Sequence, residues 1–137
     1  MGAKSRNKGA AFEREVAGLL DLHLGWKVKR NLEQYQTRGL GDLNGQPGVM
    51  IECKRYATAT DTQIERWWRE SVQQTVGEEL PVLIFKADRQ SIKAVVPFGL
   101  VFEQANHSVQ YFEPVVLDMA LFYTVARACL CQPKAKS

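Results

Sequence analysis

The apolar positions in the first part of the chain have helical spacing and then strand spacing. Between Gly9 and Leu24, large apolar side chains recur three or four residues apart, which predicts an amphipathic helix that ends at Gly25. The segment WKVKR, residues 26–30, alternates between apolar and basic side chains, as is typical of a strand. The stripe of the predicted helix consists of Phe12, Val16, Leu19 and Leu20.

A second helix and two further strands are predicted in the middle of the chain. Asp61 can cap a helix that has Trp67 and Trp68 in its apolar stripe. Residues 81–88 have the composition of a buried strand, and residues 92–98 follow as a second strand after a short polar turn.

The last part of the chain completes an α/β pattern. Residues 109–112 suggest another strand, and Asp118 can cap a final helix. This order of elements predicts an α/β fold, with a central mixed β-sheet flanked by α-helices. We expect residues 1–8 to form a flexible basic arm, residues 9–132 a single domain, and residues 133–137 a flexible tail.

Composition supports one folded domain and limits the kinds of partner. The chain has 137 residues, of which 45% are hydrophobic, and this is enough for one core. A net charge of +3 permits a polyanionic partner without requiring one. The three cysteines indicate neither a disulfide framework nor a zinc site. No apolar run predicts a signal peptide or a membrane span, so we expect a cytoplasmic protein with no membrane partner.

Candidate chemistry is concentrated in the segment GDLNGQPGVMIECKRY, which begins at Gly41. An apolar run becomes charged at Glu52 and Lys54, and the period of two places these side chains on one face of a strand. The NG dipeptide is a strong turn signal, so Asp42 is expected to end a preceding strand that doubles back and to lie beside Glu52. Two carboxylates with a nearby lysine suit a hard divalent cation that faces a phosphate.

Three segments in sequence order resemble a known nuclease superfamily. Glu13 and Glu15 lie on opposite flanks of the first apolar stripe, and periodicity alone does not choose which faces Asp42 and Glu52. The order NKGAAFERE, then GD, then ECK resembles the PD-(D/E)XK nucleases, most closely the archaeal-type Holliday junction resolvases. In those enzymes a basic segment with glycine leads into a helix bearing an ERE-like acid, followed by an acidic hairpin and an E-x-K strand.

The resemblance covers roughly residues 6–90 and implies a restriction-endonuclease-like fold. It identifies four catalytic residues, which are Glu13, Asp42, Glu52 and Lys54. It also implies a Mg²⁺ cofactor, for which Mn²⁺ can substitute, bound by Asp42, Glu52 and the backbone carbonyl of Cys53. Gly41 stands where the superfamily's name has proline, a change that those resolvases share.

Each of these residue types suits phosphodiester hydrolysis. Lys54 can hold or help to deprotonate the attacking water and offset charge on the phosphate, while Glu13 can orient a second water or metal ion. Structural alternatives remain open at this point. Glu52 and Lys54 could instead form an ion pair at a strand end, and Glu13 could be a solvated acid.

Basic residues near these segments are candidate DNA contacts. The alternative interpretation is that these side chains are only solvated on the surface. Trp67 and Trp68 could stack on bases, but tryptophans at helical spacing in an apolar stripe more often lie in a core or a subunit interface. The candidate DNA contacts are Arg6, Lys8, Arg14, Arg30, Arg38, Arg55 and Lys86.

These features lead to the hypothesis of a Mg²⁺-dependent, structure-selective DNA endonuclease of the Holliday junction resolvase type. It would hydrolyse phosphodiester bonds in branched DNA such as four-way junctions. A junction offers two symmetry-related strands, so a homodimer is expected. One alternative is a nuclease of the same superfamily acting on linear duplex, flaps or ends in restriction or repair. Another is a non-catalytic DNA-binding protein on this fold, although clustered acids do not help to bind a polyanion.

Overall fold

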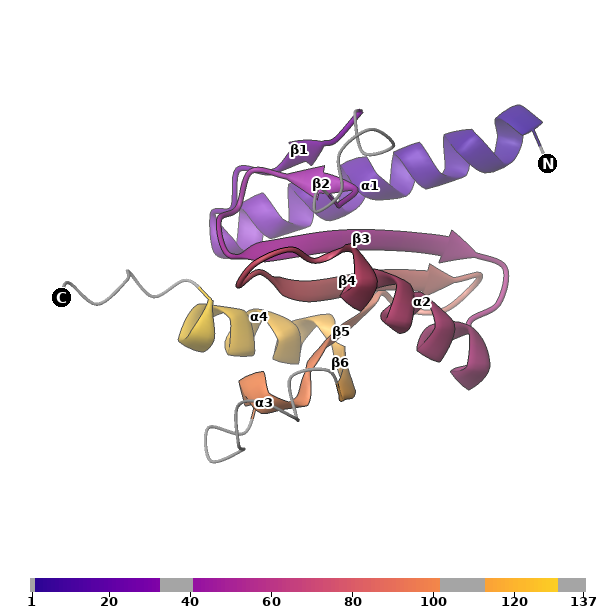
Figure 1. The fold of residues 1–137 in the computed structure, drawn as a ribbon. Helices are drawn as coiled ribbons and strands as arrows, with labels where there is room; N and C mark the ends of the chain where they lie inside the picture. The colour runs from indigo at the N-terminus through magenta and orange to yellow at the C-terminus, as the bar shows by residue number, and fades with distance from the viewer. Residues whose placement is uncertain (1, 33–40, 102–112, 131–137) are drawn as a thin grey trace, which may run out of the picture.

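The computed structural model describes residues 2–32, 41–101 and 113–130, and side chains from residue 7 onward within them (Figure 1). The elements in these ranges are α1 (Gly2–Leu24), β1 (Lys29–Arg30), β2 (Leu43–Asn44), β3 (Val49–Tyr56), α2 (Asp61–Gln74), β4 (Leu80–Ala87), β5 (Lys93–Pro97), α3 (Phe98–Val101), β6 (Pro114–Asp118) and α4 (Met119–Cys129).

The strands form one mixed sheet in the order β1-β2-β3-β4-β5-β6. Only the β3–β4 pair is parallel among the described strands, and α2 connects these two strands, as a parallel pair requires a crossover rather than a tight turn. The other neighbouring pairs are antiparallel. The structure therefore confirms the predicted α/β class and restriction-endonuclease-like fold, with a central mixed sheet flanked by helices.

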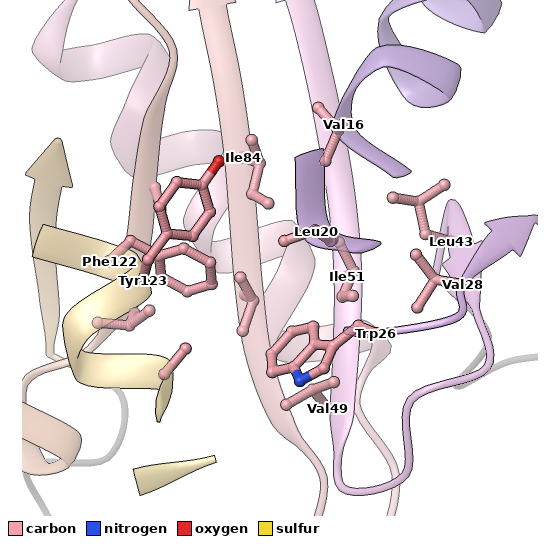
Figure 2. Packing of buried hydrophobic residues seen from close by; sticks show 14 of the residues in the cluster. Val16, Leu20, Trp26, Val28, Leu43, Val49, Ile51, Ile84, Phe122 and Tyr123 are labelled. Carbon is pink, nitrogen blue, oxygen red and sulfur yellow. The ribbon is translucent and has the colours of Figure 1, made fainter. Parts of the chain in front are cut away.

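Helices α1 and α4 cover one face of the sheet and bury its larger core. Figure 2 shows Leu20 of α1 beside Ile51 of β3, while Phe122 and Tyr123 of α4 lie on the side of Ile84 of β4. The apolar stripe predicted for the first helix is thus the face that packs on the sheet. Burying each such side chain contributes about 1.5–3 kcal/mol, which makes this contact a main source of stability.

Helix α2 covers the opposite face, over β3 and β4 (Figure 1). Trp67 and Trp68 are each 2% exposed and pack with Leu83, Phe85 and Val95. Their rings fill the smaller core. The interpretation of both tryptophans as core residues is confirmed, and neither is available to stack on a base or to form a subunit interface.

Helix α1 starts earlier than predicted. It begins at Gly2 rather than Gly9, so residues 2–8 are helical. The division into a basic arm at residues 1–8 and a domain from residue 9 stays a prediction. The apolar stripe marks where the helix is buried, whereas the residues before it include alanine, lysine and arginine, which are good helix formers.

Capping decides the other helix starts. Thr60, not Asp61, caps α2, because the Thr60 hydroxyl accepts from Gln63 N at 3.2 Å and the Gln63 side chain accepts from Thr60 N at 2.8 Å. This capping box uses a glutamine three residues after the cap, and Asp61 has no such partner in the sequence. Asp118 caps α4 as predicted, accepting from Leu121 N at 2.8 Å.

Strand predictions differ mainly at the sheet edges. The WKVKR segment contributes only Lys29–Arg30 to the sheet. The strand expected at 109–112 lies outside the described residues, as does the tail at 133–137, and the last strand is Pro114–Asp118. No helix in the described ranges is long and apolar enough to cross a membrane.

Candidate active site

Asp42 is held against β3 by two hydrogen bonds. Its backbone N donates to the carbonyl of Ile51 at 2.8 Å, and its side-chain Oδ2 accepts from the backbone N of Cys53 at 2.7 Å. The side chain is only 6% exposed. Asp42 directly precedes β2 instead of ending a strand, but the hairpin brings it beside Glu52 as predicted.

Gly41 permits this close approach. A Cβ atom at Gly41 would lie 2.8 Å from both the carbonyl carbon of Ile51 and Sδ of Met50, and would overlap the Ile51 oxygen. Backbone atoms of a central strand cannot move aside easily. The superfamily name PD-(D/E)XK has proline at this position. Glycine stands here instead, because any residue with a Cβ atom, proline included, would push Asp42 away from the strand.

Replacing Gly41 with alanine is expected to lower stability by about 1–3 kcal/mol, the usual cost of forcing extra atoms into a packed site. Gly18→Ala is the matched control, since a Cβ there meets nothing within 4 Å and residue 18 lies inside α1. The control should stabilise the protein by about 0.5–1 kcal/mol. Chemical denaturation of both variants measures this, and equal stability would contradict the tight contact at Gly41.

Glu52 lies in a half-buried position beside Asp42. Desolvation by burial, the charge of Asp42 and a hydrogen bond with the Asp42 side chain raise the pKa of Glu52 to about 8. The charge of Lys54 acts in the opposite direction but is outweighed. Two carboxyl groups that cannot easily both be ionised form an arrangement that a divalent cation would relieve.

The Glu52 pKa predicts a pH-dependent stability in the metal-free protein. Because the folded-state pKa of about 8 lies above the ordinary value of 4.5, the folded state binds more protons than the unfolded state between these pH values. Stability should be greatest near pH 5 and decrease toward pH 8, with the melting temperature falling about 5 °C more than in Glu52→Gln. Thermal unfolding in a chelator measures this difference, and Mg²⁺ should restore part of the loss at pH 8. Parallel pH profiles for the two proteins would contradict the assignment.

Lys54 points to the α2 side of the sheet, like Glu52. The Lys54 ammonium forms a salt bridge with Oε1 of Glu70 on α2, at 3.5 Å, and Glu70 is 52% exposed. The lysine is therefore not paired with Glu52 in the ion pair considered from the sequence. Sequence reasoning missed Glu70, although helical spacing places it one turn after Arg66 and beside Trp67 on the flank of α2.

The structure distinguishes Glu13 from Glu15. Glu15 is exposed, whereas Glu13 is half-buried, the charge of Asp42 raises the pKa of Glu13, and the charge of Glu13 raises the pKa of Glu52. Burial raises the pKa of Glu13 despite the hydrogen bond that Arg30 Nε donates to Glu13 Oε1 at 2.8 Å. Arg30 thus holds the Glu13 carboxyl group next to the acid pair, and its contact with DNA stays a prediction.

Two other predicted DNA contacts share one acid at the ends of β3 and β4. Asp88 Oδ1 lies 3.1 Å from Lys8 Nζ and 2.7 Å from Arg55 Nη1, and these partners lower the Asp88 pKa. Lys86 is the β4 neighbour of Arg55, so a basic cluster forms around Asp88. Sequence reasoning missed this acid, which follows its strand directly. Arg14 is exposed on α1.

The side chains of Arg6 and Arg38 lie outside the described residues, so their predicted contacts with DNA stay predictions.

The donors around Asp42 fit a hard divalent cation. Within the described ranges, no three His, Cys, Asp or Glu side chains form a metal cluster, so an ion would need backbone and water ligands as well. Ile51 O and Cys53 N both face Asp42, and strand alternation directs the Cys53 carbonyl to that same side. Burial raises the pKa of the Cys53 thiol, which favours the carbonyl over a thiolate as ligand.

Comparison with known families gives a match that covers most of the chain. A family model described as "Phage putative PDDEXK endonuclease" matches residues 4–124. The matched range includes Glu13, Asp42, Glu52 and Lys54. No curated protein and no solved structure matches.

Proposed function

The chain belongs to this PDDEXK endonuclease family, and on that basis we propose that it is a Mg²⁺-dependent DNA endonuclease of the Holliday junction resolvase type. Its substrate would be branched DNA, and its reaction the hydrolysis of a phosphodiester bond. The main support is the contact between the Asp42 and Glu52 side chains. Glu52 lies on β3, two residues before Lys54.

In this proposal, Asp42, Glu52 and the Cys53 carbonyl hold the cation. A bound Mg²⁺ would supply charge stabilisation to the scissile phosphate and lower the pKa of a water molecule. The cation would hold Glu52 in its ionised form, against the burial and the Asp42 charge that raise its pKa.

Lys54 and Glu13 would act on the water and the phosphate. The Lys54 ammonium donates a hydrogen bond to the attacking water or a phosphate oxygen, and its charge offsets the negative charge that develops there. The water oxygen bonds to phosphorus and loses a proton, the ester P–O bond breaks, and the leaving oxygen takes up a proton. Glu13, held by Arg30, orients a water molecule at the edge of the site.

Branched DNA is the proposed substrate because the NKGAAFERE, GD and ECK segments most resemble those of junction resolvases. A four-way junction has two strands to cut, so a homodimer with two sites is part of this proposal. An enzyme acting on linear duplex, flaps or ends would use the same chemistry and is the principal rival. A non-catalytic binder would gain nothing from the acid pair, which repels phosphates.

A panel of DNA substrates tests the proposal. The purified protein, with Mg²⁺ and then Mn²⁺, is incubated with a four-way junction, a flap and a linear duplex that share sequence, and Asp42→Asn serves as the blank for contaminating nuclease. Fastest cutting of the junction supports the proposal, and fastest cutting of the linear duplex supports the rival. If every DNA is bound but none is cut with either Mg²⁺ or Mn²⁺, the enzyme proposal fails.

A further inference from the structure

Tyr56 is a large exposed side chain at the end of the strand that carries the predicted catalytic residues. Glu52, Lys54 and Tyr56 share one face of β3 because side chains alternate with a period of two. Two residues of strand span about 6.6 Å, so Tyr56 follows Lys54 at roughly that distance along the strand. The Tyr56 side chain is 47% exposed. An aromatic ring therefore borders the site on the side where β3 ends.

The Tyr56 ring is supported from beneath by the smaller core. It stacks on the ring of Trp67 with centroids 5.1 Å apart and an interplanar angle of 21°. Trp67 is 2% exposed and packs in turn against Phe85, with centroids 6.0 Å apart. One face of Tyr56 is thus covered by a rigid neighbour. A ligand that stacked on the exposed ring would immobilise little additional side-chain freedom, which reduces the cost of binding.

An exposed basic side chain lies on the helix that supports Tyr56. Helical spacing places Arg66 on the flank of α2 next to Trp67, and Arg66 is exposed. A strand whose phosphate lay at Lys54 could therefore place a base near Tyr56 and a neighbouring phosphate near Arg66.

We infer that Tyr56 is a stacking platform for an unpaired base next to the phosphate that is cut. The inference rests on the proposed nuclease function and deepens it. Bases inside a continuous duplex already stack on both faces, so only a base at a branch point, in a flap or in a single strand offers a free face to the ring. Tyr56 would then select DNA with an unstacked nucleotide beside the cutting site.

Binding measurements in an Asp42→Asn background, where the DNA stays uncut, test the inference. The probes are a four-way junction, a flap, a single strand and a closed duplex without ends. Tyr56→Ala should weaken binding of the first three by about 5- to 100-fold, the range for loss of one base–aromatic stack, and leave the closed duplex unchanged. Tyr56→Phe, which keeps the ring, should retain wild-type affinity.

A control separates stacking from support of Trp67. Tyr56→Leu still covers the Trp67 ring but offers no aromatic face, so it should behave like Tyr56→Ala in binding and like Tyr56→Phe in thermal unfolding. A fluorescent base analogue next to the cutting site should lose its stacking-dependent quenching with Ala and Leu but not with Phe. Equal losses on all four DNAs, or full affinity of Tyr56→Leu, would overturn the inference. A wild-type protein that neither binds nor cuts any DNA would instead refute the proposed function.

Discussion

Replacing Asp42 with asparagine is expected to reduce DNA cleavage by a factor on the order of 10³ or more, with little change in melting temperature. Asparagine keeps an oxygen that can accept from Cys53 N, the bond that measures 2.7 Å to Asp42 Oδ2. It removes the negative charge that a divalent cation needs. DNA binding should persist or strengthen, because one charge that repels phosphates is gone.

Asp42→Ala and a surface control make this result specific. Alanine also removes the acceptor for Cys53 N, so its loss of cleavage should be accompanied by a loss of about 1–3 kcal/mol in stability. Asp21→Asn alters an exposed acid that pairs with Lys27 and should affect neither property appreciably. Cleavage assays with Mg²⁺ and thermal unfolding measure both quantities. Wild-type cutting by Asp42→Asn would remove this residue from the catalytic site.

Lys54→Ala should slow cleavage by a factor on the order of 10² or more, the range for losing a proton-transfer or charge-stabilising group. Its melting temperature should change little, because the salt bridge that it loses is to the half-exposed Glu70. Mg²⁺ affinity, measured by titration, should also be nearly unchanged. Lys54→Gln keeps most of the length and should be as slow as alanine, since the charge is what matters.

Glu70→Gln is the matched control for Lys54. It removes the same salt bridge from the other side while leaving the ammonium group in place. Cleavage should remain within a few-fold of wild type, so a large difference between the two variants would assign the effect to Lys54 itself. A Lys54→Ala protein that melts lower yet cuts at the normal rate per folded molecule would favour a purely structural lysine.

The sequence predicts best those features that depend on local periodicity. The period-two run of β3 places Glu52 and Lys54 on one face, and the hairpin before β3 brings Asp42 to that strand, because both follow from backbone geometry within about a dozen residues. The turn of this hairpin lies at Pro47–Gly48 rather than at the NG dipeptide, because Asn44 is the last residue of β2. The end of α1 at Gly25 also follows locally, since Gly25 adopts a φ of 69°.

Contacts between distant segments are not encoded in periodicity. Glu13 and Glu15 lie on the two flanks of the apolar stripe of α1. Only the packing of α1 near the hairpin brings Glu13 to Asp42 and lets Arg30 form a salt bridge with Glu13. In the same way, Lys8 and Arg55 meet Asp88 across separations that no local pattern describes. The capping choice at Thr60 was readable from the sequence, since Gln63 lies three residues later.

The unequal pairing of β3 with its two neighbours implies that the acid pair spans regions of different local stability. β3 and β4 are in register along their whole lengths from Val49 to Tyr56, whereas β2 contributes the single pair Leu43 and Ile51. Segments with few ladder hydrogen bonds open in subglobal unfolding events before the central strands do. Glu52 would then stay on the last part of the sheet to unfold while Asp42 leaves with the hairpin. If Asp42 and Glu52 hold a metal ion as proposed, cleavage activity would be lost at a lower free energy of opening than the fold itself, with the central sheet intact.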